Sequence, residues 1–199
     1  MSKIVLFIDG ENFINKVEEV LRNEGIDKYK IDVASIDVSK LVKEALKGLN
    51  ISRKMFYAAK LHSYPETRKK SEELISFQRK LRNNLVKHGY EFIIAGNVRA
   101  QKVGEKLVFR EKGVDVRIAV DLVSLACDGE LKTAILCSSD SDLQPAVKEL
   151  KQRGVEVIYL GFENNPNKGL AYTTDRTVLL RNPEVIGACP QLVKKEARN

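Results

Sequence analysis

Short apolar segments recur along this chain and alternate with segments that have the periodicity of helices. The five apolar segments are residues 3–8, 54–59, 91–95, 133–137 and 155–160. Strands that alternate with helices form a parallel sheet, because each crossover returns the chain to the same edge through a helix. The segments are almost unbroken runs of hydrophobic residues, which indicates strands covered on both faces. We therefore predict an α/β fold with five mostly parallel strands and helices on both faces of the sheet.

One helix can be placed by its period. In the segment 66–87 the apolar residues recur at spacings of three and four, which is the pattern of an amphipathic helix. These residues are Leu74, Phe77, Leu81 and Leu85. We expect this side of the helix to face the sheet and its lysines and arginines to face solvent.

The chain is expected to be a single domain in the cytoplasm. Its 199 residues are 43% hydrophobic, enough for one substantial core, and no Pro/Gly/Ser-rich linker divides them. The apolar run Ile4–Ile8 is too short for a signal peptide or a membrane span. The three cysteines, Cys127, Cys137 and Cys189, have no close spacing. We therefore expect small core residues and neither disulfides nor a zinc site.

Positive charge is concentrated in one part of the chain. The net charge is +7, and the window 60–112 carries all of this excess. Within it, residues 98–111 have β-type residues on either side of a central glycine and predict a β-hairpin. A polyanionic partner would fit this basic window, although a solvated surface is the other reading of a charge run. The candidate phosphate-binding residues are Arg99, Lys102, Lys106, Arg110 and Lys112.

Aspartates follow two of the predicted strands directly. Asp9 ends the first strand, and Asp140 and Asp142 come just after the fourth. Asp115 begins the helix that follows the hairpin. If the strand order is 3-2-1-4-5, the first and fourth strands are neighbours where the order reverses, and their carboxyl ends form the binding crevice. Two carboxylates at about 4 Å repel by roughly 4 kcal/mol at an effective dielectric of 20. A divalent cation, Mg²⁺ or Mn²⁺, would neutralise them.

Each aspartate also has a purely structural reading. An aspartate between a strand and a helix commonly caps the helix, and taken singly Asp115 and Asp142 fit that role. At Asp9 we expect Asn12 to be the cap instead, since it lies nearer the predicted helix. Asp121 shares a helix face with Arg117, and an internal ion pair is expected there. The occurrence of several aspartates at one edge of the sheet favours the metal site.

Other common chemistries have no support in the sequence. His62 and His88 are isolated, and no serine or cysteine has the flanking glycines of a nucleophile elbow. Neither a P-loop nor a GxGxxG motif is present, so no nucleotide cofactor is expected.

Three sequence blocks together resemble the signature of NYN domains, the LabA-like branch of the PIN-like nuclease superfamily. They are Phe7–Asn12, Lys112–Val116 with Asp121 beyond it, and Ser138–Leu143. The resemblance implies a three-layer, Rossmann-like fold of strand order 3-2-1-4-5 over residues 1–180, with residues 181–199 as a C-terminal tail. It also implies Asp9, Asp115, Asp140 and Asp142 as metal ligands, with Asn12 as a polar neighbour in the catalytic site. PIN nucleases add a glutamate from the second helix, for which Glu44 is a weak candidate.

The function implied by this resemblance is metal-dependent hydrolysis of RNA, by an endoribonuclease that uses Mg²⁺ or Mn²⁺. RNA is preferred over DNA through the resemblance alone. Two other readings stay open. One is a non-catalytic RNA-binding or regulatory protein that retains the acidic pocket, and the other is a metal-dependent hydrolase of small phosphoesters.

Overall fold

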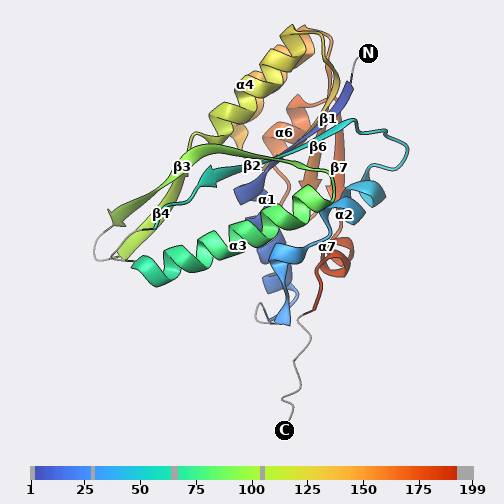
Figure 1. Cartoon of the computed structure of the whole chain (residues 1–199). Coiled ribbons are helices and arrows are strands. Elements are labelled where there is room, and N and C mark those ends of the chain that lie inside the picture. The colour runs from blue at the N-terminus through green and yellow to red at the C-terminus, as the bar shows by residue number, and fades with distance from the viewer. Residues whose placement is uncertain (1–2, 28–29, 64–66, 104–105, 192–199) are drawn as a thin grey trace.

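The computed structural model describes residues 3–27, 30–63, 67–103 and 106–191. Seven strands form one sheet of order β4-β3-β2-β1-β5-β6-β7 (Figure 1). The strands are β1 Lys3–Asp9, β2 Arg53–Lys60, β3 Glu91–Val103, β4 Lys106–Lys112, β5 Leu131–Cys137, β6 Glu156–Phe162 and β7 Arg176–Leu180. The helices are α1 Gly10–Asn23, α2 Val38–Ala45, α3 Arg68–Lys87, α4 Val114–Cys127, α5 Gln144–Gln152, α6 Lys168–Thr173 and α7 Asn182–Ala188, with short 3-10 helices η2 Val33–Ser35 and η4 Ser141–Leu143.

The five predicted strands are all present, and they lie in the predicted relative order as β3, β2, β1, β5 and β6. The predicted number of strands was wrong, because the sheet gains one strand at each edge. β3 continues through residue 103, so the hairpin is an extension of the sheet, and β4 pairs with it as an antiparallel edge strand. β7 pairs in parallel with β6. Only its last residue, Leu180, is buried, so β7 lacks the fully buried apolar run of a strand covered on both faces.

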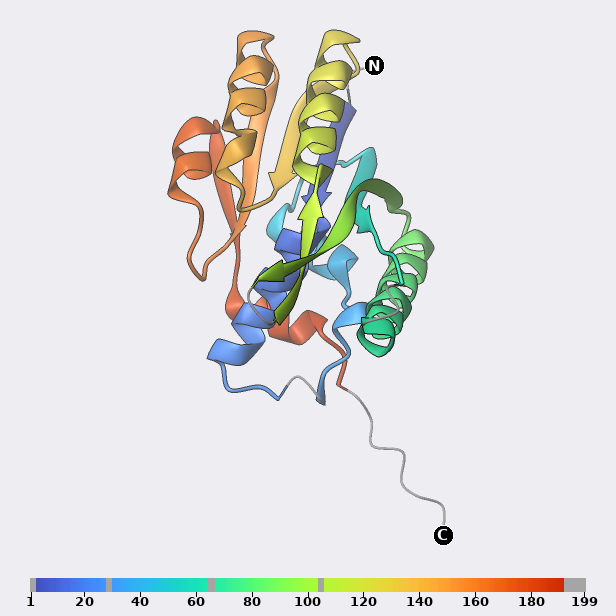
Figure 2. The ribbon, with the colours of Figure 1, turned by 90° about the vertical axis from the view of Figure 1, so that its left-hand side faces the viewer.

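Helices cover both faces of the sheet, as predicted, and make three layers (Figure 2). On one face, α1, α2, α3 and α7 pack on strand residues such as Leu6 and Ile8. On the other face, α4, α5 and α6 pack on residues such as Val5 and Phe7. Successive residues of β1 thus enter opposite cores, which explains why the strand had to be hydrophobic throughout. Among the described residues, no helix is long and apolar enough to span a membrane.

α3 confirms the helix predicted over 66–87, although residue 66 lies outside the described residues. Its C-terminal half is anchored in the core by Leu81 and Leu85, which are both buried. The other two residues of the predicted stripe, Leu74 and Phe77, are only partly buried. The N-terminal half of α3 therefore leaves apolar side chains accessible between itself and α1.

The segment from residue 181, which the sequence analysis sets apart as a tail, contains a helix of the core. Val185 and Ala188 of α7 are buried in the core on the face of the sheet that α1 covers. Ile31 and Gln191 form an isolated antiparallel bridge beyond it. The stretch 181–191 thus packs with the domain, and residues 192–199 lie outside the described residues.

The cysteines are only partly as expected. Cys137 and Cys189 are buried core residues, but Cys127 at the end of α4 is exposed, so its expected core role was wrong. The last turn of α4 extends past the sheet, and its final residue meets solvent.

Candidate metal centre

The acidic residues gather at the carboxyl ends of β1 and β5, which are neighbouring parallel strands in the middle of the sheet. β1 continues into α1 on one face of the sheet, and β5 leads through η4 into α5 on the other face. The chain therefore diverges at this point and leaves a crevice between the two strand ends, as expected where a sheet reverses its strand order.

Three of the predicted aspartates converge here. Asp115, Asp140 and Asp142 each place a carboxylate oxygen within 4.8 Å of the others. Asp115 lies in the first turn of α4, which starts after Gly113 in a left-handed conformation with φ of 91° that favours glycine. Asp140 accepts a hydrogen bond of 2.9 Å from the backbone N–H of Asp142 and so caps η4. Asp140 can therefore cap η4 and still bind a cation, because a carboxylate has further lone pairs available.

Asp9 lies beside this group, in a pocket that Asp115 and Asp140 also line, and is 3% exposed. Its carboxylate accepts hydrogen bonds from the Asn12 backbone N–H at 3.2 Å, the Asn12 side-chain amide at 2.6 Å and the Ser138 hydroxyl at 3.1 Å. Asp9 is therefore the N-cap of α1, and the expectation that Asn12 would cap this helix was wrong. The helix starts at Gly10, immediately after the strand and three residues earlier than a cap at Asn12 would place it.

The pKa of the Asp9 carboxyl is raised above its ordinary value. Burial is the main cause, and the negative charge of Asp140 adds to it. The hydrogen bonds from Asn12 and Ser138 act in the opposite direction, because they stabilise the charged form. A positive charge nearby would therefore stabilise the ionised form of the Asp9 carboxyl.

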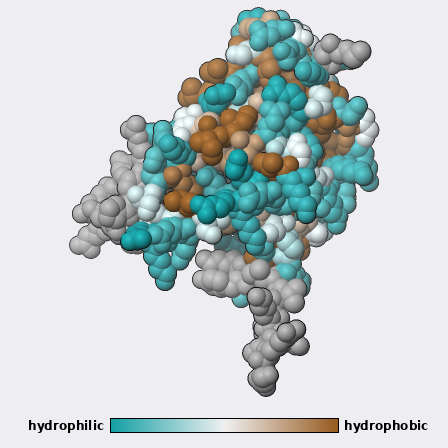
Figure 3. All heavy atoms as spheres, in the orientation of Figure 1, coloured by the Kyte–Doolittle hydropathy of each residue, from teal (hydrophilic) through white to brown (hydrophobic). Residues whose placement is uncertain are grey.

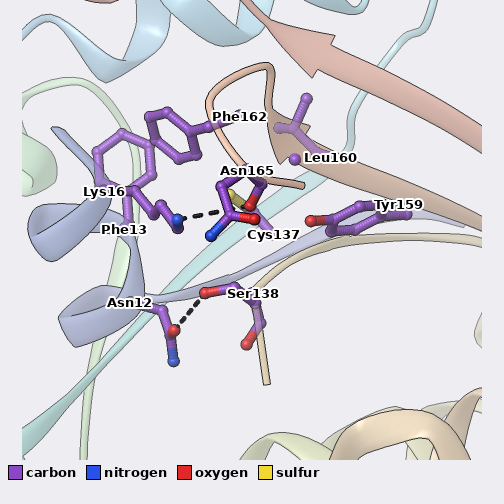
Figure 4. Close-up of a pocket in the computed structure, with 11 residues that line it drawn as sticks. Asn12, Phe13, Lys16, Cys137, Ser138, Tyr159, Leu160, Phe162 and Asn165 are labelled. Carbon is purple, nitrogen blue, oxygen red and sulfur yellow. Dashed lines mark hydrogen bonds between the residues drawn. The ribbon is translucent and has the colours of Figure 1, made fainter. Parts of the chain in front are cut away.

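A hydrogen-bonded network holds the two strand ends together. The Ser139 hydroxyl donates to the Asn12 amide oxygen at 2.6 Å, while the Asp140 backbone N–H donates to the Ser138 hydroxyl. Beside this network lies a cavity of about 10 Å³, lined by residues that include Asn12, Ser138 and Tyr159 (Figure 4), and it is close to the smallest space that holds one water molecule. Asn12, predicted as a polar neighbour of the site, links Asp9 to the loop that carries Asp140.

Asn167 braces the same loop from the opposite side and was not predicted. Its side-chain amide donates to the Ser139 carbonyl at 2.8 Å and to the Ser141 hydroxyl at 3.0 Å. The amide oxygen of Asn167 also caps α6. The sequence showed Asn167 only as part of a turn-rich loop, since nothing local connects residues 28 positions apart.

A pocket of about 370 Å³ opens between the strand ends, and it contains two further carboxylates. Asp9, Asp115 and Asp140 line it, together with Glu11, Glu111 and the exposed Lys112. Asp142 is exposed and lines a neighbouring groove between α4 and α5. Glu111 was missed by the sequence analysis, because it reaches the pocket only through the pairing of β4 with β3. Its single local signal is its position four residues before Asp115.

Glu44, the weak candidate for a fourth acid, does not belong to this site. It lies on α2 and lines a different pocket, with residues such as Lys54 and Tyr90. That pocket contains residues from the amino ends of β2 and β3, at the opposite edge of the sheet. Among the described residues that line the acidic pocket, the glutamates are Glu11 and Glu111.

The predicted ion pair of Asp121 is confirmed. Arg117 donates to the Asp121 carboxylate at 2.8 Å, and the Tyr57 hydroxyl donates to the same carboxylate at 2.9 Å. Among the basic candidates, the structure places Lys112 at the pocket. The side chains of Arg99, Lys102, Lys106 and Arg110 lie outside the described residues, and only their backbone positions in the hairpin are defined.

The donor set fits a hard divalent cation. Around an octahedral Mg²⁺ or Mn²⁺ ion with bonds of about 2.1 Å, ligand oxygens lie about 3.0 Å apart when adjacent and about 4.2 Å apart when opposite. Three carboxylate oxygens within 4.8 Å of one another can reach these separations by movements of their side chains. The carboxylates of Asp115, Asp140 and Asp142 are therefore placed to hold one cation, with Asp9 close by.

Comparison with known proteins agrees with this architecture. A crystal structure of a protein of unknown function from Vibrio parahaemolyticus superposes with a TM-score of 0.55 and 19% sequence identity, covering 90% of this chain and 93% of that chain. A search of curated protein sequences finds no match. The three-layer α/β fold with acids at its carboxyl edge is consistent with a PIN-like fold. The family model of the NYN domain matches residues 3–180, so the chain belongs to the NYN domain family.

Glu111 makes the stability of the metal-free protein depend on pH. Burial, together with the charges of Glu11 and Asp9, raises its pKa to about 8 from an ordinary value of 4.5. Between these two values the folded protein keeps a proton that the unfolded chain releases, so the free energy of unfolding falls as pH rises. We expect a lower melting temperature at pH 8 than at pH 6 in the presence of a chelator.

The matched variant for this effect is Glu111→Gln, which removes the titrating group and keeps its shape. Melting curves at both pH values should then differ less than in the parent. An equal pH dependence in parent and variant would show that Glu111 is not the group responsible.

Proposed function

We propose that this protein is a ribonuclease that hydrolyses RNA phosphodiester bonds with the help of Mg²⁺ or Mn²⁺. The observation that carries the proposal is the convergence of Asp115, Asp140 and Asp142 to within 4.8 Å in a crevice at the carboxyl edge of an NYN domain. Carboxylates held this close without a countercharge would repel one another, and the fold provides no lysine or arginine ion pair to any of them among the described salt bridges.

The residues of the pocket would have different roles in this reaction. Asp115, Asp140 and Asp142 would hold the cation, with Asp9 as a further ligand. When bound, such an ion polarises the phosphoryl oxygen and lowers the pKa of an attacking water. Asn12 and Ser138 fix the Asp9 carboxylate by hydrogen bonds. Lys112 is exposed beside the acids and would bind a phosphate of the substrate.

The basic hairpin is proposed as the wider contact for the RNA backbone. β3 and β4 pair as far as Val103 and Lys106, so the hairpin projects beyond the sheet from the same edge as the pocket (Figure 2). Arg99, Lys102, Lys106 and Arg110 would bind phosphates flanking the cut, because a metal centre cannot attract a whole strand alone. The cytoplasmic location stays a prediction from the sequence.

A parallel incubation of the purified protein with RNA, DNA of the same sequence and p-nitrophenyl phosphate tests this function. We expect cleavage of RNA with Mn²⁺ or Mg²⁺ and complete loss of cleavage with EDTA. Cleavage of p-nitrophenyl phosphate alone would instead indicate a small-phosphoester hydrolase.

Metal binding is measured separately by thermal denaturation. Mn²⁺ at about 100 times its dissociation constant stabilises a protein by about 2.7 kcal/mol. Stabilisation by Mn²⁺ without cleavage of any substrate would indicate a non-catalytic protein that retains the acidic pocket.

A further inference from the structure

A groove of about 580 Å³ runs from the acidic pocket along the outside of the sheet, between α1 and α3. Glu11 and Glu111 line both the groove and the pocket, so the two spaces adjoin at these side chains. The hairpin strand β4 contributes Phe109 to its wall. Pockets of about 300–1,000 Å³ hold small ligands in proteins, so the groove has room for a nucleobase with its ribose.

The lining of this groove is aromatic and apolar. The aromatic residues are Phe56, Phe77, Phe92 and Phe109. Phe56 and Phe92 stack with ring centroids 5.7 Å apart, and Phe77, Phe92 and Phe109 remain only partly buried. Lys70 of α3 places its ammonium group 5.2 Å from the Phe109 ring centroid. Planar bases stack favourably on such rings, because every base has an aromatic face.

The charges of the groove distinguish a base from a phosphate. Of the described residues that line it, Lys70 alone is basic, whereas Glu11, Glu18, Glu73 and Glu111 are acidic. A phosphate would be repelled by such a lining. The exocyclic amino and ring N–H groups of a base are donors, and carboxylate oxygens are suitable acceptors for them. The groove is therefore matched to the uncharged part of a nucleotide, and the adjoining acidic pocket with its cation is matched to the phosphate.

We propose that this groove binds one unpaired nucleobase of the RNA, next to the phosphate at the metal centre. The inference rests on the proposed ribonuclease function and narrows its substrate to single-stranded RNA. A base within a duplex is stacked on both faces and paired along its edge, so it cannot enter a groove of this kind without leaving the helix.

The test uses a groove-blocking variant with a matched control on the same helix. Asn15 is exposed on α1 and lines the groove, so Asn15→Phe would fill it. Asn23 is exposed at the end of α1 and lines neither the groove nor the acidic pocket. Asn23→Phe is therefore the control. Both changes are made in an Asp140→Asn background, so that the RNA stays intact during the measurement.

Binding is followed by the fluorescence of 2-aminopurine placed in turn at each position of a short single-stranded RNA. We expect quenching at one position in the control. The dissociation constant of Asn15→Phe should be at least tenfold larger than that of the control. Phe109→Ala should weaken binding about 5- to 150-fold, the range for loss of one base–aromatic contact. In the Asp140-containing protein, an abasic nucleotide at the quenched position or a complementary strand should slow cleavage by at least tenfold.

The outcomes separate this inference from the proposed function. Position-specific quenching that Asn15→Phe removes, without cleavage by the Asp140-containing protein, would retain the base-binding groove and reject the nuclease. Equal cleavage of single-stranded, duplex and abasic RNA, with no effect of Asn15→Phe, would retain the nuclease and reject the groove. Absence of position-specific quenching in the control also overturns the groove.

Discussion

Replacing Asp140 with asparagine should reduce metal-dependent RNA cleavage by about 100-fold or more, because one carboxylate ligand contributes to charge stabilisation worth several kcal/mol. The fold should not suffer. Asparagine caps a helix about as well as aspartate, so the hydrogen bond from the Asp142 N–H to residue 140 is retained. Removing one of the clustered charges also relieves repulsion. We therefore expect an unchanged or higher melting temperature in the absence of metal.

The control for this variant is Asp128→Asn, the same change at an exposed residue that ends α4 away from the pocket. It should leave both cleavage and melting temperature as in the parent. Cleavage rates at saturating RNA and melting curves with EDTA decide the matter. A large loss of stability in Asp140→Asn with cleavage preserved would mean that Asp140 is a structural cap and not a metal ligand.

A large loss of stability is expected from Gly10→Ala. A Cβ atom at residue 10 would collide with the Tyr57 carbonyl oxygen and with the Phe56 ring. The carbonyl belongs to the sheet backbone of β2 and cannot move aside without disturbing its pairing. Overpacking costs about 1–3 kcal/mol, and a clash with backbone is expected at about 3 kcal/mol, the upper end of this range. For a protein of this size the melting temperature should fall by about 6–12 °C.

Gly187→Ala is the matched control for this change. Gly187 lies in α7, and a Cβ there meets nothing within 4 Å. Alanine should stabilise the helix by about 0.5–1 kcal/mol, because glycine loses more backbone freedom on folding. Thermal denaturation of the two variants should thus shift in opposite directions. If Gly10→Ala has the same melting temperature as the parent, α1 can move relative to β2, and the close approach of residue 10 to β2 is not required for the fold.

The sequence by itself determined the α/β class and the position of the aspartates at the ends of strands, and both follow from local information. The order of the central strands was implied by the resemblance to NYN domains, and the five predicted strands have that order. Strands covered on both faces must be hydrophobic at every position, and a carboxylate directly after such a strand must lie at its carboxyl end. The ion pair of Arg117 with Asp121 was predicted for the same reason, since residues four apart on a helix are neighbours.

The tertiary structure alone decided the features that depend on distant residues. β7 and α7 have weak patterns of their own and are fixed by packing on β6 and α1. Glu111 reaches the acidic pocket only because β4 pairs with a continued β3, and Asn167 reaches the Ser139 loop only because β6 lies beside β5. Periodicity reports which face of an element is buried. It carries no information on which distant element will cover that face. The pairing of distant elements places Glu111 and the aromatic groove beside the aspartates.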